Sequence, residues 1–138
     1  MKKKIIKVIG DLMIDIWCEG TMEKKSSEAQ ISIYETDNIK YSLGGAGNLC
    51  LNLKSLGVNF KFFSEVGKDQ NGHKILNILK QKKISFLADR KKKITTSKTR
   101  LFLKNKQIFR QDIEDIKINK NISNNLIKNL DKKDIVVI

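Results

Sequence analysis

Proline is absent from this chain of 138 residues, and cysteine, histidine and tryptophan are scarce. The two cysteines, Cys18 and Cys50, are too few for a disulfide scaffold, and without a signal-peptide pattern before them they indicate a reducing cytoplasm. The single histidine, His73, has no metal-ligand set near it, so we do not expect it to be catalytic. Long apolar runs are also missing, so we expect no membrane-spanning helix and no membrane partner.

Acidic residues are few compared with basic ones, 15 against 28, which gives a net charge of +13. Arginine contributes only Arg90, Arg100 and Arg110, and the lysines are spread from Lys2 to Lys133 instead of lining one face. We therefore interpret the charge as a composition bias and do not expect nucleic acid as the partner. A basic surface still favours phosphorylated, anionic substrates.

The first pattern that the chain does contain is the short apolar run Ile5–Ile9, closed by Gly10. It predicts a buried strand of a parallel sheet. Asp11 follows at the carboxyl end of that strand, which is the edge where ligands bind in open α/β sheets. The length of the chain is that of one domain with a core of its own.

Helical spacing follows further along the chain. Leu49, Leu53 and Leu56 predict a helix that packs on the sheet and ends at Gly57. We also expect exposed strands around 14–16 and 31–33, on either side of the polar segment 19–30. A strand at 60–63 and a helix at 71–82 follow, and then a hairpin over 95–112 that turns at 104–106. The last predicted elements are a helix that carries Ile122, Leu126 and Leu130, and a strand at 134–138.

This order of elements predicts an α/β fold, with a parallel sheet flanked by helices and with projecting β segments. The projecting segments, at about 12–36 and 94–112, are placed to act as a lid. The sequence stops on the apolar residues 136–138, so we expect a fold that is incomplete at its C-terminus, the front part of a longer protein. An unfinished sheet edge would make the isolated chain aggregate.

A glycine-rich run, Leu43-Gly44-Gly45-Ala46-Gly47-Asn48, leads into the leucine helix. Glycines at a helix start let the backbone approach a polyhydroxylated ligand, and the free N–H groups of the first turn point at it. The spacing from this run through Cys50 and Gly57 to Gly67 resembles the first signature of the PfkB (ribokinase-like) carbohydrate kinases. Cys50 stands where that family usually carries Ser, Thr or Ala.

Three more segments resemble one branch of that family, the heptose 7-phosphate kinases. Residues 10–15 are similar to their GDxMxD motif, and residues 26–33 to their SPEAPVPV segment without its prolines. Residues 95–100 and 107–112 are similar to their TTxKTR and QQxxRxD block. In many bacteria such a kinase is the first half of a bifunctional protein of ADP-heptose synthesis.

The resemblance implies a ribokinase-like fold and a reaction. ATP, with Mg²⁺, would phosphorylate the anomeric hydroxyl of D-glycero-D-manno-heptose 7-phosphate. The catalytic aspartate and most of the ATP and Mg²⁺ site would lie in the second half of the fold, beyond Ile138, so this chain would be inactive alone. The lid strands of the family imply a homodimer.

By the same resemblance, Asp15 is the sugar-binding aspartate, and Gly44, Gly45 and Asn48 line the sugar pocket. A carboxylate accepts hydrogen bonds from two hydroxyls at once. The plain alternatives are a solvated strand acid for Asp15 and an N-cap for Asn48. Asp11 either binds sugar or caps a neighbouring turn.

Lys98, Arg100 and Arg110 are candidates to bind the 7-phosphate of the substrate, because guanidinium groups match phosphate oxygens in a bidentate fork. For each of them, the alternative is cross-strand pairing with Asp112 or Glu114.

Trp17 could stack on a sugar ring or pack against its neighbours. The basic run 90–93 is most simply a solvated turn, with phosphate contact as its alternative. Two other functions stay open: another PfkB kinase acting on ribose, fructose or a nucleoside, and an inactive basic module that binds anions or nucleic acid.

Overall fold

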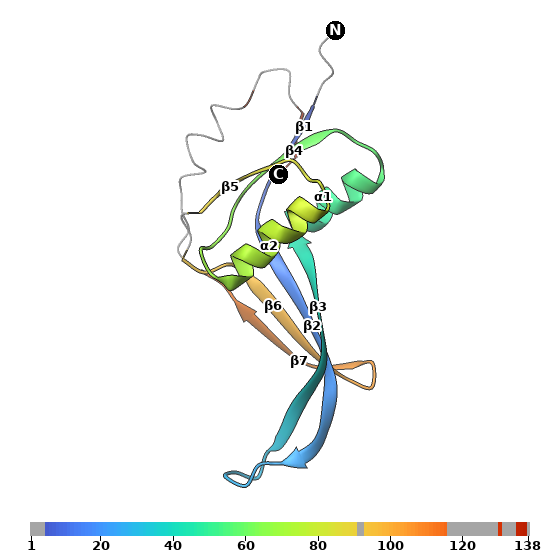
Figure 1. Cartoon of the computed structure of the whole chain (residues 1–138), viewed down its shortest axis with the longest axis vertical. Helices are drawn as coiled ribbons and strands as arrows, with labels where there is room; N and C mark the ends of the chain where they lie inside the picture. Colours follow the sequence, from blue (N-terminus) through green and yellow to red (C-terminus); the bar gives the residue numbers. More distant parts are fainter. Residues whose placement is uncertain (1–4, 91–92, 116–129, 131–134, 138) are drawn as a thin grey trace.

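The structure, a computed structural model, describes residues 5–90, 93–115, 130 and 135–137. Its strands form two four-stranded sheets, with the strand orders β5-β4-β1-β8 and β3-β2-β6-β7. Figure 1 shows that the second sheet projects away from the layer that contains both helices. The predicted α/β architecture with projecting β segments is confirmed.

The first sheet is parallel throughout. It contains β1 (Ile6–Ile9), β4 (Phe60–Glu65), β5 (Phe86–Asp89) and β8 (Ile135–Val137). Val8 of β1 lies beside Phe62 of β4, and both side chains are 1% exposed. β5 was not predicted, because its run of large apolar residues is only two long, Phe86 and Leu87.

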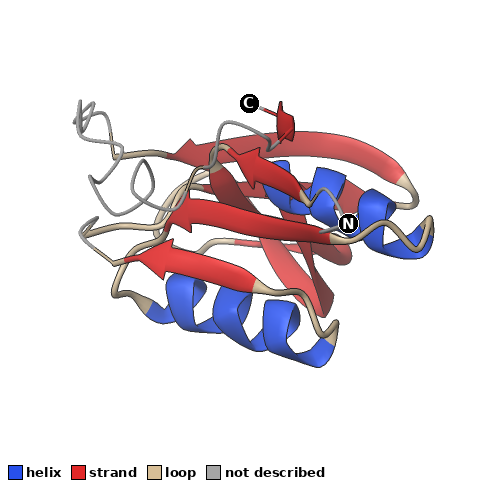
Figure 2. Ribbon diagram, turned by 90° about the horizontal axis from the view of Figure 1, so that it is seen from above, coloured by secondary structure: helices blue, strands red, loops and turns tan. Residues whose placement is uncertain are grey.

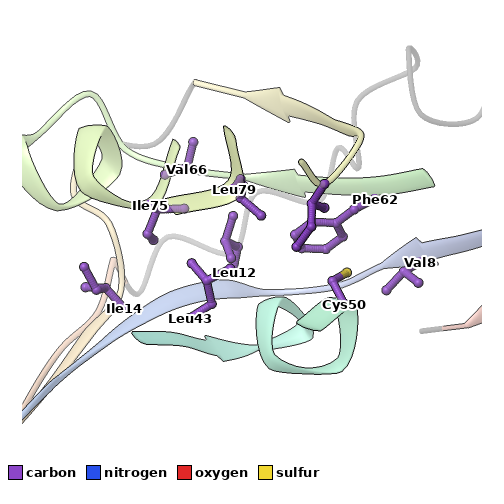
Figure 3. Packing of buried hydrophobic residues seen from close by; sticks show 10 residues of the cluster. Val8, Leu12, Ile14, Leu43, Cys50, Phe62, Val66, Ile75 and Leu79 are labelled. Carbon is purple, nitrogen blue, oxygen red and sulfur yellow. The ribbon is translucent and has the colours of Figure 1, made fainter. Parts of the chain in front are cut away.

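The helices are α1 (Ala46–Ser55) and α2 (Gln70–Gln81), and Figure 2 shows both of them against the strands. Their buried side chains join one cluster with the parallel sheet and with the first residues of the second sheet (Figure 3). The cluster contains Val8, Leu12, Ile14, Leu43, Cys50, Phe62, Val66, Ile75, Leu79 and Ile84. Side chains from both sheets therefore share one core.

Of the three leucines predicted to form the apolar stripe of α1, Leu49 and Leu53 pack against the core, and Leu56 does not. Leu56 is 75% exposed, whereas Gly47 and Cys50 are the buried residues of the helix. The helix ends at Ser55, so Leu56 is already in the cap and its side chain turns to solvent. Gly57 then reverses the chain with a φ of 69°, as its place after the leucine pattern predicted.

The second sheet is built on two long antiparallel strands, β2 (Leu12–Lys25) and β3 (Ser32–Gly45). The polar segment 19–30 was predicted to separate two short strands, but its residues up to Lys25 continue β2. Polar side chains bond across this ribbon, for example Lys24 to Glu35 at 2.7 Å. The base of β2 is also not exposed as predicted, since Ile14 is fully buried.

The predicted hairpin is confirmed as β6 (Ser97–Leu103) and β7 (Lys106–Ile113). Lys104 and Asn105 at its turn have φ values of 47° and 66°, as in the two-residue turns that suit the twist of paired strands. β6 lies parallel to β2 and antiparallel to β7.

The last predicted strand is present as β8. The helix predicted to carry Ile122, Leu126 and Leu130 lies outside the described residues except for Leu130. Within the described part of the chain, neither helix has the length and apolar character needed to cross a membrane.

Candidate functional site

The glycine turn lies directly against the two candidate aspartates. A Cβ on Gly44 would lie 2.6 Å from Asp15 Oδ2, so the carboxylate occupies the place that any other residue would need. Gly45 has a φ of 57°, and a Cβ there would lie 2.5 Å from the backbone oxygen of Asp11. Both positions therefore require glycine, for contacts inside the protein.

Asp15 forms an ion pair with Arg100 from the neighbouring strand. Arg100 Nη1 donates to Asp15 Oδ1 at 2.6 Å, and each side chain is 17% exposed. The guanidinium carbon also lies 4.9 Å from the ring centroid of Trp17. The carboxylate that pairs with Arg100 is therefore Asp15, and not Asp112 or Glu114 as in the predicted alternative. The predicted contact of Arg100 with phosphate stays a prediction.

Lys98 and Arg110 both contact Asp112. Arg110 binds this carboxylate through Nε and Nη2, each at 2.7 Å, and Lys98 Nζ lies 3.2 Å away. The hydrogen bonds from Arg110 lower the pKa of Asp112 to about 2. Lys98 Nζ also lies 3.5 Å from Glu114, so Lys98 has the cross-strand partners that were the alternative to phosphate contact. Arg110 pairs with Asp112 two residues along its own strand.

The start of α1 is held by backbone contacts. The N–H of Ala46 donates to the backbone oxygen of Asp11 at 2.9 Å, which ties the turn between β1 and β2 to the helix. Gly45 is the N-cap residue and has no side chain. Asn48 is therefore not the N-cap, and its side chain is exposed in the first turn of the helix.

A cavity of about 380 Å³ lies farther out on the projecting sheet. Its lining residues are Trp17, Glu19, Lys40, Tyr41, Ser42 and Phe102. Trp17 stacks on Phe102 with ring centroids 5.7 Å apart, and its Nε1 donates to Ser42 Oγ at 3.4 Å. Trp17 thus packs against its neighbours and also lines a space of the size that small ligands occupy.

Asp69 and Thr95 form a connection that the sequence did not suggest. Asp69 Oδ1 accepts from the N–H of Gly72, which caps α2, and from Thr95 Oγ1 at 2.5 Å. Oδ2 accepts from the N–H of Thr95 at 2.9 Å, and Thr95 Oγ1 in turn accepts from the N–H of Gly67 at 3.0 Å. An aspartate three residues before a glycine at a helix start signals the cap, but no local pattern signals Thr95.

Burial raises the pKa of Asp69, and the hydrogen bonds from Thr95 and Gly72 more than reverse this effect, so its pKa lies below the usual range. Asp69 therefore stays ionised and holds the segment that enters β6, the strand of Arg100 and Lys98.

Neither cysteine is suited to nucleophilic chemistry. Burial raises the pKa of Cys50 to about 12 and also raises that of Cys18. Among the described residues, no group of three or more His, Cys, Asp or Glu side chains could hold a metal ion.

The arrangement suits the binding of a hydroxylated ligand. One oxygen of Asp15 is held by Arg100, and the other lies at the glycine turn, which is followed by an exposed asparagine in the first turn of the helix. A carboxylate that is fixed in this way can accept hydrogen bonds from ligand hydroxyls.

The family model described as pfkB family carbohydrate kinase matches residues 3–138. A protein called bifunctional protein HldE, from Aliarcobacter butzleri, is 36% identical over 135 residues, which are 95% of this chain and 28% of that protein. Another bifunctional protein HldE, from Helicobacter acinonychis, is 41% identical over 112 residues, 79% of this chain and 24% of that protein. The chain thus spans about a quarter of the length of these curated relatives.

Solved structures agree with the fold. A carbohydrate kinase from Agrobacterium tumefaciens superposes with a TM-score of 0.62 at 19% identity, covering 80% of this chain and 36% of that one. Phosphofructokinase-2 from Escherichia coli, in complex with fructose-6-phosphate, also superposes with a TM-score of 0.62, at 13% identity, covering 81% of this chain and 36% of that one. The fold is therefore ribokinase-like.

Proposed function

Because the chain belongs to the pfkB family of carbohydrate kinases, we propose that it is the sugar-binding part of a cytoplasmic heptose 7-phosphate kinase. The relatives named bifunctional protein HldE support this choice of branch. The proposed reaction transfers the γ-phosphoryl group of ATP to the anomeric hydroxyl of heptose 7-phosphate, a step in making a precursor of the lipopolysaccharide core.

In this proposal the residues of this chain bind and orient the sugar. ATP would supply the phosphoryl group and Mg²⁺ would neutralise its charge, as in phosphoryl transfer generally. Since the described residues contain no group of three or more possible metal ligands, we assign them no contact with either group. The catalytic aspartate and the ATP contacts belong to the other three quarters of such a protein.

The sugar would lie at the junction of the two sheets, under the lid segments 12–36 and 94–112. We assign the sugar hydroxyls to Asp11, Asp15, Gly44, Gly45 and Asn48, and the 7-phosphate to Lys98, Arg100 and Arg110. The observation that carries the proposal is the contact of Asp15 with both Gly44 and Arg100. It presents a half-buried, oriented carboxylate at a helix start, as the recognition of a polyol requires.

Calorimetric titration of this chain with heptose 7-phosphate tests the proposal. We expect binding by the unchanged chain and a loss of about tenfold or more in Asp15→Asn, because a charge-assisted acceptor is replaced by a neutral amide. Asp37→Asn, at an exposed aspartate of β3, is the matched control and should bind as the unchanged chain does. Absence of binding, or equal affinities of the two variants, would contradict the proposal.

Two other functions are tested with the same material. Tighter binding of ribose, fructose 6-phosphate or a nucleoside would favour another substrate within the family. Tight binding of DNA with a steep dependence on salt would favour the basic binding module, since neutralised phosphates release counterions.

A further inference from the structure

The cavity on the projecting sheet is lined by one cation, Lys40, and a second cation, Arg100, lies in the same row of the sheet, over the ring of Trp17. In the strand register Trp17 of β2 pairs with Lys40 of β3 on one side and with Arg100 of β6 on the other. Directly paired residues point to the same face of a sheet, and neighbouring strands are 4.7–4.9 Å apart, so the two cationic residues start about 10 Å apart with the indole between them.

Each cation also has a carboxylate partner in the structure. Lys40 Nζ donates to Glu19 Oε1 at 2.9 Å, and Arg100 is paired with Asp15. The Lys40 and Glu19 side chains are 63% and 49% exposed, and a pair that exposed contributes little to stability. Glu19 has a second donor, Asn38 Nδ2 at 3.1 Å, which would hold the carboxylate when Lys40 leaves it.

Arg100 keeps donors for a ligand. In the region that the structure describes, its hydrogen bonds, to Asp15 and to the backbone oxygen of Lys98, all use Nη1. A guanidinium carries five N–H donors, so those on Nε and Nη2 are left for an anion above Trp17. The stacked rings of Trp17 and Phe102 form an apolar wall of the cavity.

We propose that this cavity is an anion subsite, in which Lys40 leaves Glu19 to bind the phosphate of a phosphorylated ligand together with Arg100. Glu19 then acts as a competitor that occupies Lys40 while the subsite is empty. The proposal adds Lys40 and Trp17 to the binding residues and moves the phosphate toward β3, away from Lys98 and Arg110, which contact Asp112. That the phosphate belongs to a sugar rests on the proposed function.

The test uses the whole chain and three substitutions, with two probes that carry phosphate and one that does not. The probes are inorganic phosphate, heptose 7-phosphate and the unphosphorylated heptose. Trp17 is the single tryptophan of the chain, so its fluorescence reports on the cavity, and calorimetry measures the same binding independently. Lys40→Met removes the proposed phosphate ligand, and Glu19→Gln removes its competitor.

Lys24→Met is the matched control, because Lys24 also pairs with a glutamate across the same two strands, at 2.7 Å and with a side chain 68% exposed, but does not line the cavity. We expect Lys40→Met to weaken both phosphate-bearing probes about tenfold and to leave the heptose unchanged. Glu19→Gln should tighten the same two probes severalfold, whereas Lys24→Met should bind like the unchanged chain.

Three results would overturn the subsite: no binding of either phosphate-bearing probe, equal affinities of Lys40→Met and Lys24→Met, or weaker phosphate binding by Glu19→Gln. The outcome is distinguishable from failure of the proposed function. If Asp15→Asn weakens heptose 7-phosphate but Lys40→Met does not, the subsite fails and the function stands. If Lys40→Met and Glu19→Gln change the affinity for inorganic phosphate as expected, but heptose 7-phosphate binds no more tightly than inorganic phosphate, the subsite stands and the function fails.

Discussion

The two glycines that close β3 have no room for a side chain, each for a different reason. At Gly44 the obstacle is the carboxylate of Asp15, and at Gly45 it is a backbone oxygen. A side-chain neighbour can move aside at some cost, but the backbone oxygen of Asp11 moves only with the turn between β1 and β2. The position of Asp15 relative to the helix start is therefore set by residues that cannot be enlarged.

Alanine substitutions at two glycines with positive φ, Gly57 and Gly45, distinguish the cost of backbone strain from the cost of steric crowding. Gly57 has a φ of 69° with nothing within 4 Å of an added Cβ, so Gly57→Ala should lower the free energy of unfolding by about 1–2 kcal/mol. Gly45 has a similar φ of 57° and also a backbone oxygen at 2.5 Å, so Gly45→Ala should cost roughly 1–3 kcal/mol more. Urea unfolding measures the free energy of unfolding of both variants. Equal midpoints and slopes for Gly57→Ala and Gly45→Ala would show that the crowding at Gly45 is relieved without cost.

Among the elements, β6 is the strand whose entry is bonded to the helical layer. It pairs with β2 in the projecting sheet, and the segment before it is bonded to the cap of α2 through Thr95 and Asp69. Thr95 is 1% exposed, and the N–H of Ile14 donates to the oxygen of Thr96 at 3.0 Å. The strand that carries Arg100 is thus anchored to the helical layer at its first residues.

The Asp69 anchor should make stability depend on acid pH. Since the pKa of Asp69 is lower in the folded chain than in the unfolded one, its stabilisation is present above the unfolded pKa of about 3.9 and is lost as the pH falls through the folded value. Asp69→Asn should lower the free energy of unfolding at pH 7 by about 2 kcal/mol or more and flatten its decline below pH 4.

Thr95→Val serves as the partner variant, because it removes one hydrogen-bond donor to Asp69 and keeps the shape of the side chain. The free energies of the two single variants and the double variant should not add, since both changes break the same contact. Additive losses, or an unchanged acid dependence in Asp69→Asn, would contradict the anchor.

On the scale of the whole molecule, the projecting sheet exposes apolar side chains on the face that continues from the core. Ile39, Tyr41, Phe109 and Ile113 are 46%, 39%, 55% and 42% exposed. The register places Tyr41 beside Ile16, two residues beyond the buried Ile14, so this face runs outward from the shared cluster. An apolar sheet face of this kind suits contact with a second copy.

We expect a homodimer through the lid strands, as the family resemblance implies. Phe109→Glu should shift the chain toward monomer in sedimentation equilibrium, because it places a charge on the apolar face. Leu87→Glu is the control, since Leu87 is 48% exposed but lies on β5, in the other sheet. An unchanged chain that is monomeric, or equal effects of the two variants, would contradict this expectation.

Much of the fold could be predicted because its signals are local. The glycine run, the leucine period and Gly57 together predicted α1 and its end, and the apolar runs predicted β1 and β4. Leu56 was misplaced because a helix period does not show where the last turn stops. The polar half of β2 was missed because its strand state depends on side chains of β3 across the ribbon.

The candidate site likewise has features that could be predicted from local signals and features that depend on contacts across the fold. The sequence was sufficient to single out Asp15, the glycine turn and Arg100, since their residue types and spacing carry the family resemblance. The pairing of Asp15 with Arg100 joins positions 85 residues apart, and that of Thr95 with Asp69 joins positions 26 apart. Such partners are set by which strands pair and in which register, and a shift of one residue would turn every side chain to the other face, so only the folded chain reveals them.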